Sequence, residues 1–141
     1  MTAPTFLAVL AAVAQVALTL WAIVRMGLAR VASVRSGETQ VADIALSDRA
    51  WPEHIQKLQA NTRNQFETPI LFFAGLAIAL AVGVAGWGVA VFAWAYVASR
   101  VVHRAIHVGS NAIGKRFRAY VLGLGALAGL WAALLLGIIL P

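Results

Sequence analysis

Two short polar clusters flank a long apolar stretch and carry the side chains best suited to chemistry. The clusters contain Arg63, Asn64 and Glu67 before the stretch, and Arg100, His103, Arg104 and His107 after it. No residue between Thr68 and Ser99 is charged. The stretch is too short for two complete membrane spans, each of which needs about 20 residues. Its flanking charges therefore fall within the bilayer, where charged side chains are costly and in most cases functional.

The depth of these charges follows from the turn that divides the apolar stretch. Gly83 and Gly86 mark this turn, and an α-helix rises about 1.5 Å per residue. Glu67 then lies about 24 Å from the turn and Arg100 about 21 Å, inside a hydrocarbon core about 30 Å thick. Two opposite charges at nearly the same depth predict either an ion pair that fixes the helix register or part of a functional site.

The basic residues after the turn share one helical face, because their spacing is i, i+3, i+4 and i+7. Asn64 and Glu67, three residues apart, are expected to share a face of the preceding helix. Neither polar face can be exposed to lipid cheaply, so the two faces are predicted to meet in the protein interior. His103 and His107, four residues apart, suit a metal ion, but no third ligand has a suitable spacing. No metal site is predicted.

The composition narrows the chemistry that these residues can perform. Of the 141 residues, 62% are hydrophobic and 11% are charged, whereas a soluble domain has about 25% charged residues. The chain is therefore predicted to be a polytopic membrane protein. It contains no cysteine, which excludes disulfides, thiolate metal ligands and a thiol nucleophile on the protein. Any thiol chemistry would need a thiol carried by a cosubstrate.

The basic residues are confined to two parts of the chain. All eleven Lys and Arg residues lie within residues 25–63 and 100–118. This distribution is typical of membrane proteins with cytoplasmic basic loops, so both segments are predicted to be cytoplasmic and both termini to lie on the opposite side. It explains the net charge of +6 without nucleic acid. The expected partners are membrane lipids and a lipophilic small molecule.

Four membrane-spanning helices are predicted to position these side chains, in one all-α domain that covers residues 1–141. The expected spans are 2–25, 52–82, 87–107 and 116–140. The second span is expected to bend near Pro69. Small residues in the last span predict close packing on a neighbouring helix; they are Gly123, Gly125, Gly129 and Gly137. Four short spans bury little area against one another, which favours a homo-oligomer.

The segment from Asn64 to Pro69 resembles a motif of the MAPEG family (membrane-associated proteins in eicosanoid and glutathione metabolism). That motif is N-x-x-E with a nearby proline, and Tyr96 with Arg100 resembles the Y-x-x-x-R pattern of the family's third helix. The resemblance covers nearly the whole chain and is closer to the bacterial branch. It implies an inner-membrane homotrimer of four-helix bundles, with glutathione bound as a cosubstrate between subunits near the cytoplasmic face.

The same resemblance implies roles for individual residues. Asn64 and Glu67 would contact the backbone groups of glutathione, and Arg100 would support Glu67 or the ligand. Arg116 would be the catalytic residue that holds the sulfur as thiolate, because a nearby positive charge lowers the pKa of a thiol. Beyond what the resemblance implies, His103 and His107 are expected to bind the carboxylates of glutathione, and Arg63 is expected to belong to the same binding set. The implied activity is that of a glutathione-dependent transferase or peroxidase acting on lipophilic electrophiles from the bilayer.

The chain differs from the glutathione-using members at four positions. Ala60 stands where they carry an arginine, Thr68 where they carry a tyrosine, and His103 and His107 where they carry tyrosines. Lys57 and Arg63 are the candidate replacements for the arginine, although neither has the same helical position.

Two other functions use the same residues. A non-catalytic scaffold or lipid-binding subunit would hold an anionic lipid headgroup in the same basic intersubunit cavity. A proton or anion pathway would use Glu67, His103 and His107, but the sequence lacks the pairs of interrupted helices that are typical of transporters.

Overall fold

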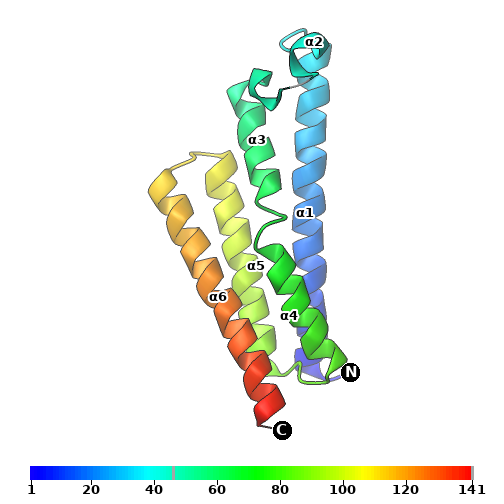
Figure 1. The fold of residues 1–141 in the computed structure, drawn as a ribbon, viewed down its shortest axis with the longest axis vertical. Coiled ribbons are helices and arrows are strands. Elements are labelled where there is room, and N and C mark those ends of the chain that lie inside the picture. Colours follow the sequence, from blue (N-terminus) through cyan, green and yellow to red (C-terminus); the bar gives the residue numbers. More distant parts are fainter. Residues whose placement is uncertain (46, 141) are drawn as a thin grey trace.

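The fold is a bundle of helices, seen in a computed structural model that describes residues 1–45 and 47–140 (Figure 1). In chain order the elements are α1 (Ala3–Arg35), α2 (Val41–Ile44), the 3-10 turn η1 (Asp48–Ala50), α3 (Glu53–Arg63), α4 (Pro69–Ala81), α5 (Trp87–Val108) and α6 (Ile113–Ile139). Regular structure within the described residues is entirely helical, as predicted. In this part of the chain, α1, α5 and α6 are long and apolar enough to cross a membrane.

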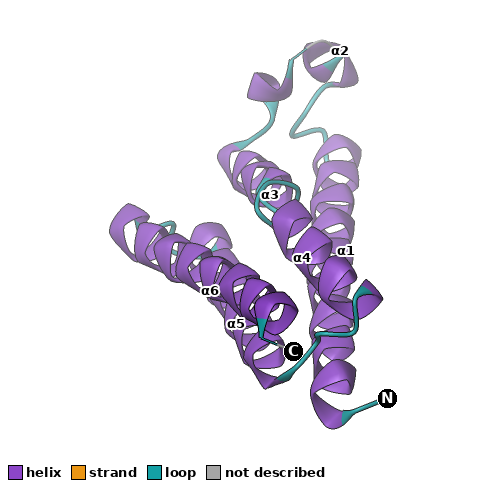
Figure 2. Cartoon of the chain, turned by 60° about the horizontal axis from the view of Figure 1, so that its bottom comes forward, coloured by secondary structure: helices purple, strands orange, loops and turns teal. Residues whose placement is uncertain are grey.

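The helices form two groups that run side by side. α3 and α4 follow one another along α1, and α5 pairs with α6 (Figures 1 and 2). Both termini and the α4–α5 turn lie at one end of the bundle, while α2 and η1 lie at the other (Figure 1). The two segments that contain all Lys and Arg residues, 25–63 and 100–118, lie away from the termini. The basic residues are thus gathered toward one end of the fold.

The predicted second span is interrupted, and this is the main correction to the sequence-based interpretation. α3 ends at Arg63 and α4 begins at Pro69. Pro69 has no N–H to donate and restricts the residue before it, so it suits the first turn of a new helix better than the middle of an old one. α4 is a shorter apolar helix. The count of four spans therefore remains a prediction.

The other spans agree more closely with the predicted boundaries. α5 and α6 match 87–107 and 116–140 within three residues at either end. α1 continues past the predicted end at Arg25 as far as Arg35, where it lies against α3. Arg30 of this extension donates a hydrogen bond to the side chain of Gln59 at 2.6 Å. The extension is therefore part of the bundle, and it carries one of the basic residues.

Close packing at the glycines of α6 joins α5, α6 and the loop before α5. A methyl group added at Gly123 would lie 2.6 Å from the Ser99 hydroxyl, and at Gly129 it would overlap the Phe92 ring. At Gly137 it would lie 3.0 Å from a side-chain carbon of Val84. These three contacts confirm the predicted close packing. The prediction is wrong for Gly125, which has nothing within 4 Å of that position.

Candidate functional site

The polar face of α5 is turned into the bundle. Arg100, His103, Arg104 and His107 are each between 2 and 4% exposed, in agreement with their shared helical face. Buried charged groups are stable only when partners satisfy them. The contacts of these four side chains therefore decide how α1, α3 and α5 fit together.

Arg104 connects α5 to α1 and α3. Its guanidinium lies over the Trp21 ring of α1, 4.2 Å from the ring centroid, and it donates a short hydrogen bond to the side-chain oxygen of Asn61 on α3. Asn61 is fully buried. This buried cation thus has a π face on one side and an amide oxygen on the other.

Asn64 is the polar residue where α3 ends. Its backbone oxygen accepts a hydrogen bond from Arg100 at 2.7 Å. Its side-chain nitrogen lies 3.4 Å from Nε2 of His103 and 3.5 Å from Nδ1 of His107. The structure therefore brings four of the expected site residues together at the break between α3 and α4, because the freed carbonyl of Asn64 needs a donor.

Arg116 lies near the start of α6, on the helix that packs beside His103. The ring of Tyr120 lies 6.1 Å from that of His103, and Arg116 precedes Tyr120 by one helical turn on the same face of α6. The Arg116 guanidinium donates to the side-chain oxygen of Asn111 at 2.7 Å. Asn111 takes a positive φ of 49° in the α5–α6 turn, a conformation that asparagine tolerates well. The turn thus holds the Arg116 side chain through a neutral partner.

Glu67 does not join this interior, contrary to its expected meeting with Arg100. The Glu67 side chain is exposed, and the ion pairs within the described residues do not include one between Glu67 and Arg100. Arg100 binds the Asn64 carbonyl instead. Residues 64–68 are not helical, so Asn64 and Glu67 do not share a helix face as predicted. The break turns Glu67 outward.

Glu67 and Arg63 instead line a cavity on the outside of α3, which we call the outer groove. The outer groove has a volume of about 300 Å³. Every lining residue except Ala60 has a charged or amide side chain, and these are Asp48, Arg49, Gln56, Gln59, Arg63, Asn64 and Glu67. Two guanidinium groups and two carboxylates therefore surround one small space. Among the residues that the structure describes, Asn64 alone lines this groove and also contacts the buried histidines.

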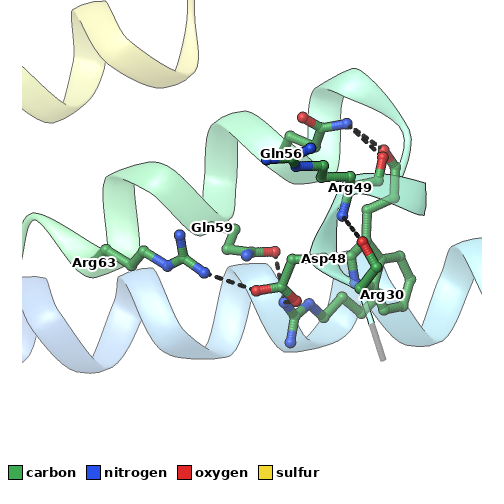
Figure 3. A network of polar contacts seen from close by, with 8 residues as sticks. Arg30, Asp48, Arg49, Gln56, Gln59 and Arg63 are labelled. Carbon is green, nitrogen blue, oxygen red and sulfur yellow. Dashed lines mark hydrogen bonds and ion pairs between the residues drawn. The ribbon is translucent and has the colours of Figure 1, made fainter. Parts of the chain in front are cut away.

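Asp48 organises the charges at one end of the outer groove (Figure 3). One carboxylate oxygen accepts from Arg63 at 2.7 Å and the other lies 3.5 Å from Arg30. The sequence interpretation missed Asp48, Arg49 and the two glutamines. The glutamines had a detectable signal, because Gln56, Gln59 and Arg63 recur at helical spacing on α3. Asp48 had none, since its place depends on the path of the α1–α3 connection.

Two further polar contacts of the interior were also missed. Gln15 of α1 is fully buried and donates to the side-chain oxygen of Gln65 at 3.2 Å. The hydroxyl groups of Thr68 and Tyr96 lie 2.8 Å apart. Gln15 was detectable, because an amide within an apolar span needs an internal partner. Both contacts attach the break at residues 64–68 to helices on its two sides.

Comparisons with known proteins add one result to this geometry. The sequence model of the MAPEG family matches residues 8–136. Searches of curated proteins and of solved structures found no match.

Proposed function

Because this chain belongs to the MAPEG family, we propose that it binds glutathione or a related anionic thiol and uses it to conjugate or reduce lipophilic electrophiles. The observation that carries this proposal is the outer groove. It presents positive and negative side chains beside Asn64 and Glu67, within a volume of about 300 Å³. A volume of this size is at the lower end of the range for small-molecule sites.

The charges of the groove suit a zwitterionic peptide better than a simple anion. At neutral pH glutathione has two carboxylates and one ammonium group. Arg49 and Arg63 would pair with carboxylates, and Glu67 would pair with the ammonium group. Such charge-assisted hydrogen bonds are about twice as strong as neutral ones. Ala60 occupies the position at which glutathione-using members carry an arginine. Arg63, three residues later, would supply a guanidinium in its place.

The thiol would point inward, past Asn64 toward the histidines and Arg116. Arg116 binds a neutral amide, so its positive charge would favour the thiolate over the thiol. The thiol proton would leave to water, and the thiolate sulfur would attack the electrophile. With a chlorinated nitrobenzene, the new bond is carbon–sulfur and the bond that breaks is carbon–chlorine, with chloride as the leaving group.

The proposal includes four spans and a homotrimer. α4 alone is short, so the second span would consist of α4, the break and part of α3, which all lie along α1 (Figure 1). The outer groove would then face a neighbouring subunit at the cytoplasmic side of a bacterial inner membrane. The lipophilic electrophile would arrive from the bilayer.

The rival function is a non-catalytic scaffold or lipid-binding subunit. The internal contacts of Arg100, His103, Arg104 and His107 favour it, because these side chains already serve the packing of α5. In that case the outer groove would hold a lipid headgroup and would not respond to a thiol.

A conjugation assay tests the proposal. Protein purified in detergent should conjugate glutathione to 1-chloro-2,4-dinitrobenzene, measured by absorbance. Arg116→Ala should lose at least about tenfold in rate, because one charge-stabilising contact to a reacting group is worth about 2 kcal/mol or more. Arg35→Ala, which removes an exposed arginine at the end of α1, should retain the wild-type rate. Absence of both turnover and glutathione binding would remove the proposal.

A further inference from the structure

A second and larger cavity lies on the α5–α6 side of the molecule, which we call the α5–α6 groove. It has a volume of about 570 Å³. Its walls are small or apolar residues such as Ala95, Ala98, Val102 and Leu122, and two cations belong to the lining, Lys115 and Arg118. It shares no residue with the outer groove. An apolar channel with positive charges near the start of α6 fits an amphiphile rather than a polar metabolite.

A smaller apolar groove also has Arg118 in its lining. It has a volume of about 320 Å³, is lined by Phe117 and Val121, and shares Arg118 and Leu122 with the α5–α6 groove. Two apolar grooves therefore meet at one arginine. This arrangement matches a molecule with two hydrocarbon chains joined at one charged headgroup.

The cations at this point have no counter-ion on their own helices. No aspartate or glutamate occurs after Glu67 in the sequence, so α5 and α6 contain none. Among the residues that the structure describes, Lys115 and Arg118 take part in no ion pair or side-chain hydrogen bond. Both side chains are exposed. Exposed cations beside apolar surface near the membrane boundary complement an anionic lipid.

We propose that this face binds one anionic diacyl phospholipid, with the phosphate between Lys115 and Arg118 and one acyl chain in each groove. The charges select the headgroup, and the two grooves select a two-chain lipid over a single-chain detergent. The site is separate from the outer groove, so lipid binding here does not depend on the thiol chemistry proposed above.

The test is native mass spectrometry of the detergent-purified protein with added phosphatidylglycerol or phosphatidylcholine of the same acyl chains. Phosphatidylglycerol should bind at least about fivefold more tightly. Arg118→Gln should weaken it about fivefold, since one Lys or Arg near an anionic surface is worth about 1 kcal/mol and 1.4 kcal/mol is tenfold. Arg35→Gln removes the same charge at a position that lines neither of these two grooves and should have no such effect. Equal binding of the two lipids, or equal losses in the two variants, would overturn the proposal.

The grooves themselves are tested by filling them without changing charge. Ala98→Phe occupies the wall of the α5–α6 groove and should lower phosphatidylglycerol binding by at least about fivefold. Ala128→Phe places the same ring at an exposed position of α6 that lines neither groove, and binding should be unchanged. Glycerol phosphate at a similar concentration should not compete. Competition by glycerol phosphate, or conversion of the oligomer to monomers by Ala98→Phe, would show that the face serves another ligand or a second copy of the chain.

Discussion

The segment Asn61–Glu67 has two faces with opposite properties. The inward face carries Asn61 and Gln65, which are almost fully buried and bind Arg104 and Gln15. The outward face carries Arg63 and Glu67, which are exposed and line the outer groove. A stretch of seven residues thus supplies both the buried contacts of the bundle and the charged walls of a cavity.

The two faces are therefore expected to have different roles: the inward face stabilises the fold, and the outward face is available to a ligand. A buried polar group that loses its partner destabilises the fold, because the remaining group stays out of water. An exposed charge contributes little to stability and can exchange an exposed partner, such as Asp48 for Arg63, for a ligand. Asn64 belongs to both faces, since it lines the groove and contacts two buried histidines. It is therefore the residue through which a ligand would affect the interior.

The largest expected change in stability comes from a substitution on the inward face. Asn61→Leu keeps a side chain of similar size but removes the oxygen that accepts from Arg104. The free energy of unfolding should fall by about 3 kcal/mol, because a buried guanidinium then lacks its hydrogen-bond acceptor. Denaturation of the purified protein in mixed micelles measures this change.

Asn61→Asp is the matched control for that experiment. It retains an acceptor for Arg104, so the free energy of unfolding should stay within about 1 kcal/mol of wild type. Equal stability of Asn61→Leu and wild type would contradict the structural role given to the inward face.

The smallest expected change in stability comes from a substitution on the outward face. Asp48→Asn weakens the ion pairs with Arg63 and Arg30 at one end of the outer groove. The side chains of Asp48 and Arg63 are more than half exposed and that of Arg30 is about a third exposed, so the free energy of unfolding should fall by at most about 1 kcal/mol. The loss should disappear in about 1 M salt, which screens exposed charges. A loss as large as that of Asn61→Leu would mean that the two faces do not differ as described.

The sequence was sufficient to predict the features that depend on helical periodicity. The spacing from Arg100 to His107 placed four side chains on one buried face of α5, and the boundaries of α5 and α6 followed from apolar length. The glycines of α6 were assigned close packing, which holds at three of four positions. In each case a local pattern determined the result.

The features that depend on the path of the chain were not predictable in this way. Treating residues 52–82 as one bent helix placed Glu67 beside Arg100, whereas the break before Pro69 turns Glu67 outward. Asp48 reaches the outer groove only because the α1–α3 connection folds back to it. A change of chain direction over a few residues reverses which side chains face inward. The periodicity of apolar residues does not indicate such a change.

The central claim is that the outer groove binds a zwitterionic thiol peptide, and a pair of isotherms tests it most directly. Calorimetry would compare glutathione with its analogue that lacks the amino group, using wild-type protein and Glu67→Gln. The wild type should bind glutathione about tenfold more tightly than the analogue, since a charged hydrogen bond contributes about 1.5 kcal/mol or more. In Glu67→Gln this preference should vanish. Equal affinities in the wild type, or a preference that survives in Glu67→Gln, would contradict the claim.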